Sequence, residues 1–514
     1  MSRTCWVLAT LLFAACARAG GPLNVRDFGA IGDGKSLDTA AIQKAIDAAF
    51  GAGGGTVWLP SGTFLSGTLV LKSNVTLHLE AGAVLRGSRD IRQYPDHTPQ
   101  VDYLYRSRFT KHLIYADRAD NIAITGRGLI DGQGEHFKAA PGDDKGRPYI
   151  LRFSECRNVR VRDVSFRNSA RWLSHYLACE NVVIDGITIH SRIRENRDGI
   201  DIDSCTDVSV SNCHVFTGDD AIVLKSTIAG RPCRRVTIVN CTLSSMASAL
   251  KLGTESNGGF EDVTVSNCVV YDTGYSGIGI MMVDGARLER VTFSDITMRN
   301  VRVPIFIRLG NRARPIPGHE RPGVGTLRDV VVRNVQASDV GSTGCSVTGI
   351  PGHRVENVTL ESIRIVFAGG GPAADTERTV PEREEGYPSG RMFGTLPAYG
   401  FYCRHAKNLK LRNVDLSFAK EDARPAVVCD DVEDVDIAGL RAEAAPAAEA
   451  VLRFQDVRDA FIRGCRPHGQ AKAFLHVTGK MSSGIVLSGN DLRRVREPWT
   501  KGETATDGAV VMEK

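Results

Sequence analysis

The sequence predicts an all-β protein, a right-handed parallel β-helix in which short strands wind into one elongated solenoid with a helix capping its amino-terminal end. Short β-branched segments recur along most of the 514-residue chain. In the central region their starts lie roughly 23 to 28 residues apart, a period typical of solenoids. Apolar and polar residues alternate within each segment, which indicates strands. The handedness follows the usual twist preference of parallel strands.

The first residues have the features of an export signal. Arg3 precedes an apolar run from Trp6 to Ala15 that is too short to span a bilayer, and residues 17–19 form a small-x-small cleavage site. We therefore expect a signal peptide over residues 1–19 and a secreted or periplasmic protein. Lipidation of Cys16, which would give an outer-membrane lipoprotein, is the alternative. No later segment predicts a transmembrane helix.

The remaining chain, residues 20–514, is predicted to form a single β-helix domain. Apolar residues at helical spacing from Asp38 to Phe50 predict a helix that Asp38 can cap. Because the terminal coil of a solenoid must be covered, we expect this helix to close the open end of the stack.

Repeated phrases place equivalent residues on successive coils. VSVSNC, VTIVNC and VTVSNC end at Cys213, Cys241 and Cys268. The asparagine before each cysteine is expected to stack and hydrogen-bond along the axis, with the cysteines stacked inside. Loss of the signal leaves 13 − 2 = 11 cysteines, an odd number that cannot all pair within one chain. No CxxC pair suggests zinc.

Residues 368–405 interrupt the repeat with a stretch rich in Gly, Pro and charge, and then in aromatic residues. Such an excursion often packs over one face of a solenoid and forms the wall of a cleft. A disordered surface insertion is the alternative.

The charge of the chain says little about partners. The formal net charge is +5 and the basic residues are scattered, so we do not expect nucleic acid to bind. We expect a monomer without a cofactor.

Two neighbouring segments concentrate carboxylates. Asn196–Cys205 carries three aspartates, and Thr217–Ser226 carries the adjacent pair Asp219 and Asp220. Asp198 and Asp219 are 219 − 198 = 21 residues apart, close to one coil. Both are therefore expected on the same outer face, with Asp220 beside them.

A cluster of three carboxylates suits two kinds of chemistry. Like charges raise at least one pKa, so one carboxyl keeps a proton for the leaving oxygen of a glycoside while another activates water. The same three groups suit a calcium ion. The residues alone hardly distinguish glycoside hydrolysis from calcium binding.

A resemblance favours hydrolysis without a metal. The chain resembles glycoside hydrolase family 28, the polygalacturonase family, in the opening NVRDFGAIGDG and in Arg147–Trp172, Cys179–Ile189, Asn196–Cys205 and Thr217–Ser226. The resemblance implies an inverting mechanism in which Asp219 protonates the glycosidic oxygen while Asp198 and Asp220 activate water. Asp201 and Asp203, in the same phrase, are interpreted as turn residues.

Two motifs of that family are replaced in this sequence. The stretch SSMASALKLGTES stands where the family has GHG, so Ala247 or Ser248 takes the place of the histidine. Gly279-Ile280-Met281 stands where the family has RIK. Without those two cations a galacturonate carboxylate loses its main charge-assisted contacts, so the sugar specificity is open.

Other side chains are candidates for contacts with the substrate, because each is placed on a coil near the acids. These candidates are Lys225, Lys251, Glu255, Arg308, Trp172 and His175. Lys225 follows the acid pair on its strand, and it is the best candidate for supporting that pair.

The sequence thus predicts a secreted glycoside hydrolase that cleaves a pectin-type polysaccharide or oligosaccharide related to galacturonan or rhamnogalacturonan. A polysaccharide lyase, which would use calcium and an Arg or Lys base, is one alternative. A glycan-binding β-helix that has lost its activity is the other.

Overall fold

The computed structural model describes residues 21–106, 108–137, 146–193 and 196–513. The predicted signal peptide and the lipidation site at Cys16 therefore lie outside the described residues. Among the described helices, none is long and apolar enough to cross a bilayer.

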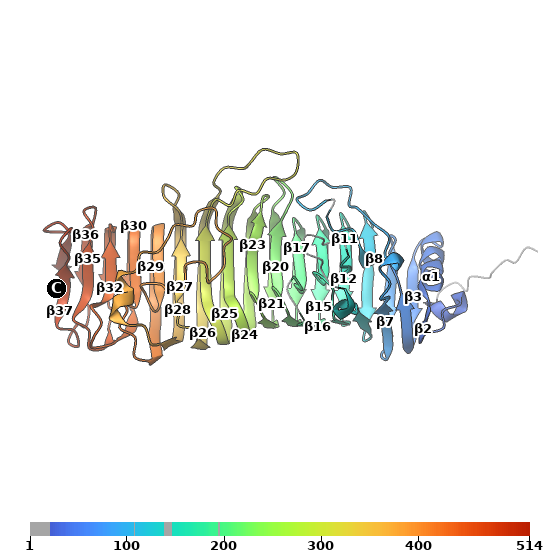
Figure 1. Ribbon diagram of the computed structural model, residues 1–514, viewed down its shortest axis with the longest axis horizontal. Coiled ribbons are helices and arrows are strands. Elements are labelled where there is room, and N and C mark those ends of the chain that lie inside the picture. Colours follow the sequence, from blue (N-terminus) through green and yellow to red (C-terminus); the bar gives the residue numbers. More distant parts are fainter. Residues whose placement is uncertain (1–20, 107, 138–145, 194–195, 514) are drawn as a thin grey trace, which may run out of the picture.

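Parallel strands stacked coil upon coil form one elongated solenoid (Figure 1). In its central part each coil contributes one strand to each of three faces. The first face consists of β8 (His112–Asp117), β11 (Tyr149–Ser154), β14 (Ser174–Leu177), β17 (Ile200–Asp203), β20 (Ile222–Ser226) and β23 (Leu250–Ser256). The predicted fold class, a right-handed parallel β-helix, is confirmed.

The other two faces follow in the same order along each coil. The second face consists of β12 (Arg157–Arg162), β15 (Glu180–Asp185), β18 (Thr206–Ser211) and β21 (Cys233–Val239), and the third of β13 (Ser165–Arg167), β16 (Thr188–Ser191), β19 (His214–Thr217) and β22 (Thr242–Ser245). The turn that leads from the third face back to the first carries the predicted catalytic acids.

Further along the chain, single strands run through the bends. β24 pairs with strands of all three faces of the preceding coil. These long strands are β24 (Phe260–Met282), β25 (Arg287–Leu309), β26 (Thr326–Val340), β28 (Val355–Gly369), β29 (Phe401–Lys420) and β30 (Val427–Ala438). The short strand β27 (Cys345–Thr348) continues the first face between β25 and β29, and the last coil ends with β38 (Val510–Glu513).

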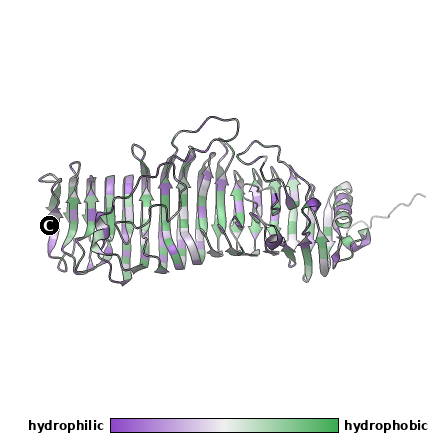
Figure 2. Cartoon of the chain, viewed as in Figure 1, coloured by the Kyte–Doolittle hydropathy of each residue, from purple (hydrophilic) through white to green (hydrophobic). Residues whose placement is uncertain are grey.

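The core is a set of apolar rows inside the coils. Ile200, Ile222 and Leu250 occupy equivalent positions on successive coils, and all are buried. Figure 2 shows the alternation of hydrophobic and hydrophilic residues along the strands that places one set inside. Each such side chain contributes about 1.5–3 kcal/mol by burial, and only stacking provides that burial, because one coil has no core of its own.

The cysteines behave as buried apolar residues, as predicted. Those of the described ranges are all free and buried. Cys241 lies in register between Cys213 and Cys268, so these three sulfur atoms form a row inside the solenoid.

Asparagine side chains form a ladder at one bend. Asn121 donates to Asn74 at 2.8 Å, Asn158 to Asn121 at 2.9 Å, and Asn181 to Asn158 at 2.7 Å. All four residues adopt the left-handed backbone conformation, which asparagine tolerates better than most residues. Asparagine thus has two roles at this bend. Its backbone tolerates the left-handed conformation that most other residues disfavour, and its side-chain amide hydrogen-bonds to the asparagine of the neighbouring coil.

The predicted second ladder is present in part. Asn240 donates to Asn212 at 3.3 Å, and Asn267 adopts the same left-handed conformation one coil later.

The amino-terminal helix α1 (Thr39–Gly51) covers the first coils (Figure 1). Asp38 precedes it but does not cap it with its side chain, contrary to the prediction. Its carboxylate instead accepts the backbone N–H groups of Ile31 at 2.7 Å and Gly32 at 3.1 Å. Because the backbone of the preceding loop donates these two hydrogen bonds to the carboxylate, the carboxylate does not cap the helix.

The excursion from the repeat spans residues 370–400, between the end of β28 and the start of β29, and is somewhat shorter than the predicted 368–405. We call residues 370–400 the covering segment. It packs onto the first face, where Val380, Phe393 and Leu396 bury an apolar patch formed by Met281, Val303 and Phe306.

Candidate active site

The three predicted acids lie on two consecutive coils at the start of the first face. Gly199 donates its backbone N–H to the carbonyl of Asp220, and Leu173 donates to the carbonyl of Asp198. Asp198 therefore stacks on Asp220, and Asp219 precedes Asp220 in the same turn. Asp198 and Asp220 are 2% and 3% exposed, whereas Asp219 is half-buried.

Each buried acid has a lysine beside it. The Nζ of Lys251 lies 2.7 Å from Oδ2 of Asp220, and the Nζ of Lys225 lies 3.4 Å from Oδ2 of Asp198. Burial alone lowers the pKa of Lys251, but the charge of Asp220 more than offsets this, so its pKa is raised. Both predicted lysines are thus charged groups inside the site, and neither is a solvated surface residue.

The acids have displaced pKa values. Burial raises the pKa of Asp198 to about 8, with a further contribution from the charge of Asp219. Burial also raises the pKa of Asp219, followed by the charge of Asp220. The cluster therefore keeps a proton near neutral pH, which general acid catalysis requires.

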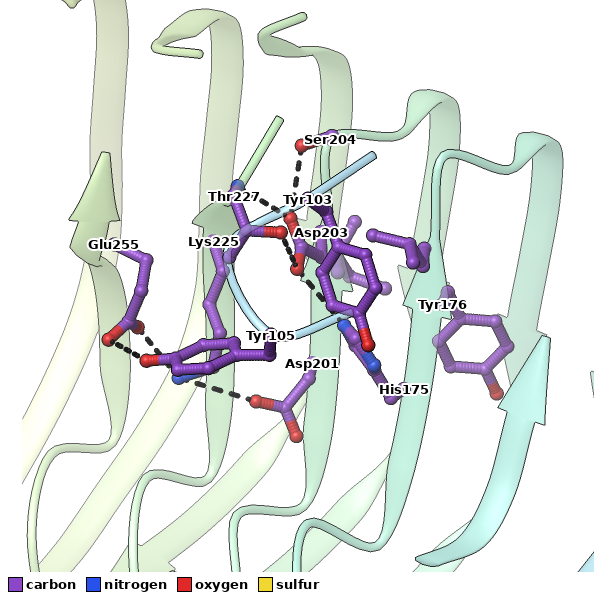
Figure 3. Close-up of polar contacts among 12 residues, drawn as sticks. Tyr103, Tyr105, His175, Tyr176, Asp201, Asp203, Ser204, Lys225, Thr227 and Glu255 are labelled. Atoms are coloured by element: carbon purple, nitrogen blue, oxygen red, sulfur yellow. Dashed lines mark hydrogen bonds and ion pairs between the residues drawn. The ribbon is translucent and has the colours of Figure 1, made fainter. Parts of the chain in front are cut away.

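Glu255 is held by hydroxyl and cationic groups (Figure 3). Its Oε1 accepts a hydrogen bond of 2.8 Å from the hydroxyl of Tyr105, and its Oε2 lies 3.4 Å from the Nζ of Lys225. Burial raises the pKa of Glu255, but the charges of Lys225 and Arg312 outweigh it, so the net pKa is lowered. Glu255 is thus ionised, and it orients Lys225 towards the acids.

The two further aspartates of the Asn196–Cys205 phrase have different roles. Asp203 holds a turn, as predicted, because it accepts the backbone N–H of Thr227 at 2.9 Å and its hydroxyl at 2.6 Å. The prediction for Asp201 is wrong, since it lies inside β17 and its Oδ1 is 3.5 Å from the Nζ of Lys225. Lys225 therefore touches three carboxylates at once.

His175 and Trp172 lie on the coil before Asp198, as expected, and both are buried. His175 contacts Asp203 through Nε2 at 3.1 Å (Figure 3). Burial lowers its pKa to about 4 although Asp203 opposes the shift, so the imidazole is neutral at pH 7. The ring of Trp172 has its centre 4.3 Å from the Nζ of Lys225, so this ring faces a protein cation.

Arg308 does not point into the site. Its Nη1 donates to the carbonyl of Gly349 at 2.7 Å, and its Nη2 donates to the carbonyl of Glu382 at 2.7 Å. Glu382 belongs to the covering segment, so Arg308 fixes this segment onto the first face. The interpretation of Arg308 as a substrate contact missed these carbonyls, because both lie far along the chain.

The positions of the two replaced family motifs differ in their surroundings. Ser248, at the histidine position, donates its backbone N–H to Oδ1 of Asp220 at 3.1 Å. Met281, at a basic position of RIK, is 1% exposed beneath the covering segment. Its neighbour Gly279 lies next to the same methionine side chain. A cation at position 281 would be buried against apolar side chains.

Three site residues were missed from the sequence: Tyr105, Arg312 and Tyr387. Arg312 pairs with Asp284, and its Nη2 lies 3.9 Å from Glu255. Tyr387, on the covering segment, is 59% exposed, and its ring centre is 5.9 Å from the Nζ of Lys251 and 5.9 Å from Cζ of Arg312. The aromatic content of the excursion was the one signal that indicated such a residue.

The sequence profile of the glycosyl hydrolases family 28 matches residues 55–383. The chain belongs to glycosyl hydrolases family 28. This confirms the resemblance and identifies the protein as an O-glycosyl hydrolase. A second profile, described as rhamnogalacturonase A/epimerase, pectate lyase-like, matches residues 23–85.

Relatives of this family 28 chain are named for their action on galacturonan. A probable polygalacturonase from Vitis vinifera is 29% identical over 385 residues, which cover 70% of this chain and 78% of the relative. An exo-poly-alpha-D-galacturonosidase from Dickeya chrysanthemi is 27% identical over 335 residues, covering 54% and 55% of the two chains.

Solved structures share the fold of this family 28 protein. The exopolygalacturonase of Yersinia enterocolitica superposes with a TM-score of 0.65 at 24% identity, covering 81% of this chain and 78% of its own. The exopolygalacturonase of Thermotoga maritima gives a TM-score of 0.63 at 24% identity, covering 77% and 92%.

Proposed function

We propose that this family 28 protein is a secreted enzyme that hydrolyses galacturonate-containing glycosidic bonds of a pectin-type polysaccharide or oligosaccharide, with inversion at the anomeric carbon. The observation that carries the proposal is the packing of Asp198 against Asp220, beside Asp219, with a proton retained by the cluster. The names of the curated relatives support the choice of sugar. The export signal predicted over residues 1–19 supports secretion.

The arrangement assigns a step to each acid. Asp219 is the most accessible of the three and has a raised pKa, which suits the group that gives its proton to the glycosidic oxygen. One proton of a water molecule passes to Asp220 or to the ionised form of Asp198, and the oxygen of that water attacks the anomeric carbon from the side opposite the glycosidic oxygen. The bond between that carbon and the glycosidic oxygen breaks, and the leaving sugar departs with the proton of Asp219.

Cations from other coils replace the RIK pair in this proposal. The Nζ of Lys251 and the Cζ of Arg312 each lie 5.9 Å from the centre of the exposed ring of Tyr387. A galacturonate carboxylate that binds there meets two positive charges and an aromatic face, which together favour an acidic sugar.

Product analysis tests this proposal. The purified protein is incubated with polygalacturonan, rhamnogalacturonan and pectic oligosaccharides, with and without a chelator. We expect chelator-resistant release of reducing sugar from galacturonate-containing substrates, with no unsaturated product absorbing in the ultraviolet. Asp219→Asn should lower kcat by about 10²–10⁴-fold, whereas Asp207→Asn, which changes an exposed acid paired with Arg235, should not.

Two outcomes contradict the proposal. An unsaturated, calcium-dependent product indicates a lyase. Binding to these glycans without turnover indicates a glycan-binding protein. Proton NMR of the anomeric signal at early times checks the stereochemistry, and retention of configuration overturns the inverting mechanism.

A further inference from the structure

A groove runs along one edge of the solenoid, mainly on the carboxyl-terminal side of the acids. It follows the turns that lead from the third face back to the first, and its volume is about 570 Å³, which is within the usual range of ligand sites. The lining comes from five such turns, at residues 192, 245–246, 272–274, 300–302 and 339–343. We call this feature the edge groove.

The edge groove adjoins the turn of Asp219. Its residue Met246 donates its backbone N–H to the carbonyl of Thr217, and the hydroxyl of its residue Ser245 donates to the carbonyl of Asp219 at 2.7 Å. The side chain of Met246 is 51% exposed. A glycan bound at Asp219 therefore reaches the edge groove one coil further along the axis.

Beyond β23 the covering segment occupies the first face. It buries the apolar side chain of Met281, and the buried arginines beneath it are engaged by its own backbone. Nη1 of Arg404 donates to the carbonyl of Val380 at 2.7 Å, and Nη2 of Arg308 donates to the carbonyl of Glu382 at 2.7 Å. A glycan chain that extends past β23 therefore has to leave the first face, and the edge groove is the adjoining depression.

Three arginines border the edge groove, and the described residues place no carboxylate within ion-pair distance of any of them. Cζ of Arg192 lies 4.3 Å from the ring centre of Phe216, and Cζ of Arg391, on the covering segment, lies 4.0 Å from that of Tyr275, the residue next to the lining turn of β24. Arg302 belongs to the lining and is exposed. Guanidinium groups without a protein partner are strong ligands for a carboxylate.

Side-chain oxygens form a row in the lining. Asp272, Asn300 and Asp339 occupy equivalent positions on three successive coils, each one residue after paired positions of β24, β25 and β26. Nδ2 of Asn300 donates to Oδ1 of Asp272 at 2.7 Å. Successive coils are about 4.8 Å apart, close to the length of one pyranose unit, so oxygens at this interval suit the hydroxyl groups of successive sugars.

From these features we infer that the edge groove is a second glycan-binding region, outside the catalytic site, which holds the acidic sugars of a chain that extends past the cleaved bond. The sugar carboxylates meet the three arginines, and the hydroxyl groups meet the row of oxygens. Three cations outnumber the two carboxylates of the lining, so an acidic chain is favoured over a neutral one. Five strand spacings separate the coil of Arg192 from that of Asp339, which gives a length of about 24 Å. The inference rests on the proposed function for the kind of sugar.

The dependence of kcat/KM on chain length tests this inference. Oligogalacturonides are compared from the shortest that the parent cleaves to chains of about ten units, and kcat/KM of the parent should rise with length. We expect Arg302→Glu to lower kcat/KM by about tenfold on the long chains and by less than about twofold on the shortest, because only long chains reach the edge groove. Arg160→Glu makes the same charge change at an exposed position of β12 on the second face, and it should leave both values unchanged.

Binding is measured separately from turnover. Asp219→Asn, which retains the edge groove, is titrated by calorimetry with the long oligogalacturonide and with a neutral galactan oligosaccharide of the same length. We expect the neutral chain to bind at least about tenfold more weakly than the acidic one. Adding Arg302→Glu should weaken binding of the acidic chain by about tenfold, and higher salt should reduce the preference for that chain.

The outcomes separate the inference from the proposed function. The same length dependence in Arg302→Glu and the parent, or equal affinities with and without this substitution, overturns the edge groove and leaves the hydrolase assignment standing. Equal binding of acidic and neutral chains overturns the class of ligand. Absence of cleavage of every pectic substrate by the parent overturns the proposed function, and the titration then decides on the edge groove by itself. Arg302→Glu should keep the Tm of the parent because the side chain is exposed; a lower Tm would assign the loss to destabilisation, against the inference.

Discussion

The Nζ of Lys225 lies 3.4 Å from Oδ2 of Asp198 on the preceding coil. Both side chains are buried, so salt screens their attraction only weakly. Burial raises the pKa of Asp198 and the charge of Lys225 opposes that rise. The lysine therefore sets the pH at which this acid becomes available as a base.

Removal of that charge should move the pH profile. We expect Lys225→Met to shift the acidic limb of kcat/KM to higher pH by about one unit, because Asp198 then loses its proton less readily. Initial rates between about pH 4 and pH 9 measure the limb. Lys225→Arg keeps the charge and serves as the control; equal shifts in both variants would contradict the role given to the charge.

Asp198 also links stability to pH. Its pKa of about 8 in the folded chain lies above the unfolded value of about 3.9. Between these values the folded chain binds more protons than the unfolded chain, so the free energy of unfolding falls as pH rises. Asp198→Asn removes this dependence, and its Tm relative to the parent should increase between pH 5 and pH 8.

Thermal unfolding at those two pH values measures the effect, with Asp207→Asn as the exposed control. A relative Tm that stays constant or decreases with pH would show that Asp198 is ionised throughout. The same variant is expected to lose activity, since the amide cannot accept a proton from water.

Tyr387 is expected to contribute to substrate binding. Tyr387→Ala should raise KM by about three- to tenfold with little change in kcat, since an aromatic contact contributes about 0.5–1.5 kcal/mol. Tyr387→Phe keeps the ring and should behave like the parent. Because the side chain is 59% exposed, neither variant should change Tm, and a lower Tm for the alanine variant would indicate a structural role instead.

The asparagine ladder should contribute to stability through two separable effects. Asn158→Ala removes hydrogen bonds to both neighbours and places alanine at a φ of 55°; we expect a loss of about 1–3 kcal/mol. Asn158→Gly removes the same hydrogen bonds but tolerates the backbone conformation. Its Tm should lie between those of the parent and the alanine variant; equal Tm values for all three would exclude a contribution of the ladder.

The sequence contains the information for the coils and the acids because both depend on local patterns. Asp198 and Asp220 recur with the period of the solenoid, so their proximity follows from counting residues. Which of the two adjacent acids stacks on Asp198 does not follow from the period, because the turns before β17 and β20 differ in length.

The contacts that irregular segments make around the site could not be predicted in the same way. Tyr105 and Glu255 are 150 residues apart in sequence, and neither belongs to a repeated phrase. The contacts of Arg308 with Gly349 and Glu382 depend on the path of an irregular segment. Such contacts result from loop conformation, for which strand periodicity carries no information.

The row of unpaired thiols inside the solenoid has a practical consequence. Since the described cysteines are free and buried, no disulfide bond joins the coils that carry them, and the packing of these coils does not depend on an oxidising environment. A thiol reagent reaches Cys213, Cys241 or Cys268 only where neighbouring coils separate. The rate of their alkylation therefore reports how often this part of the stack opens, and no cysteine has to be introduced for the measurement.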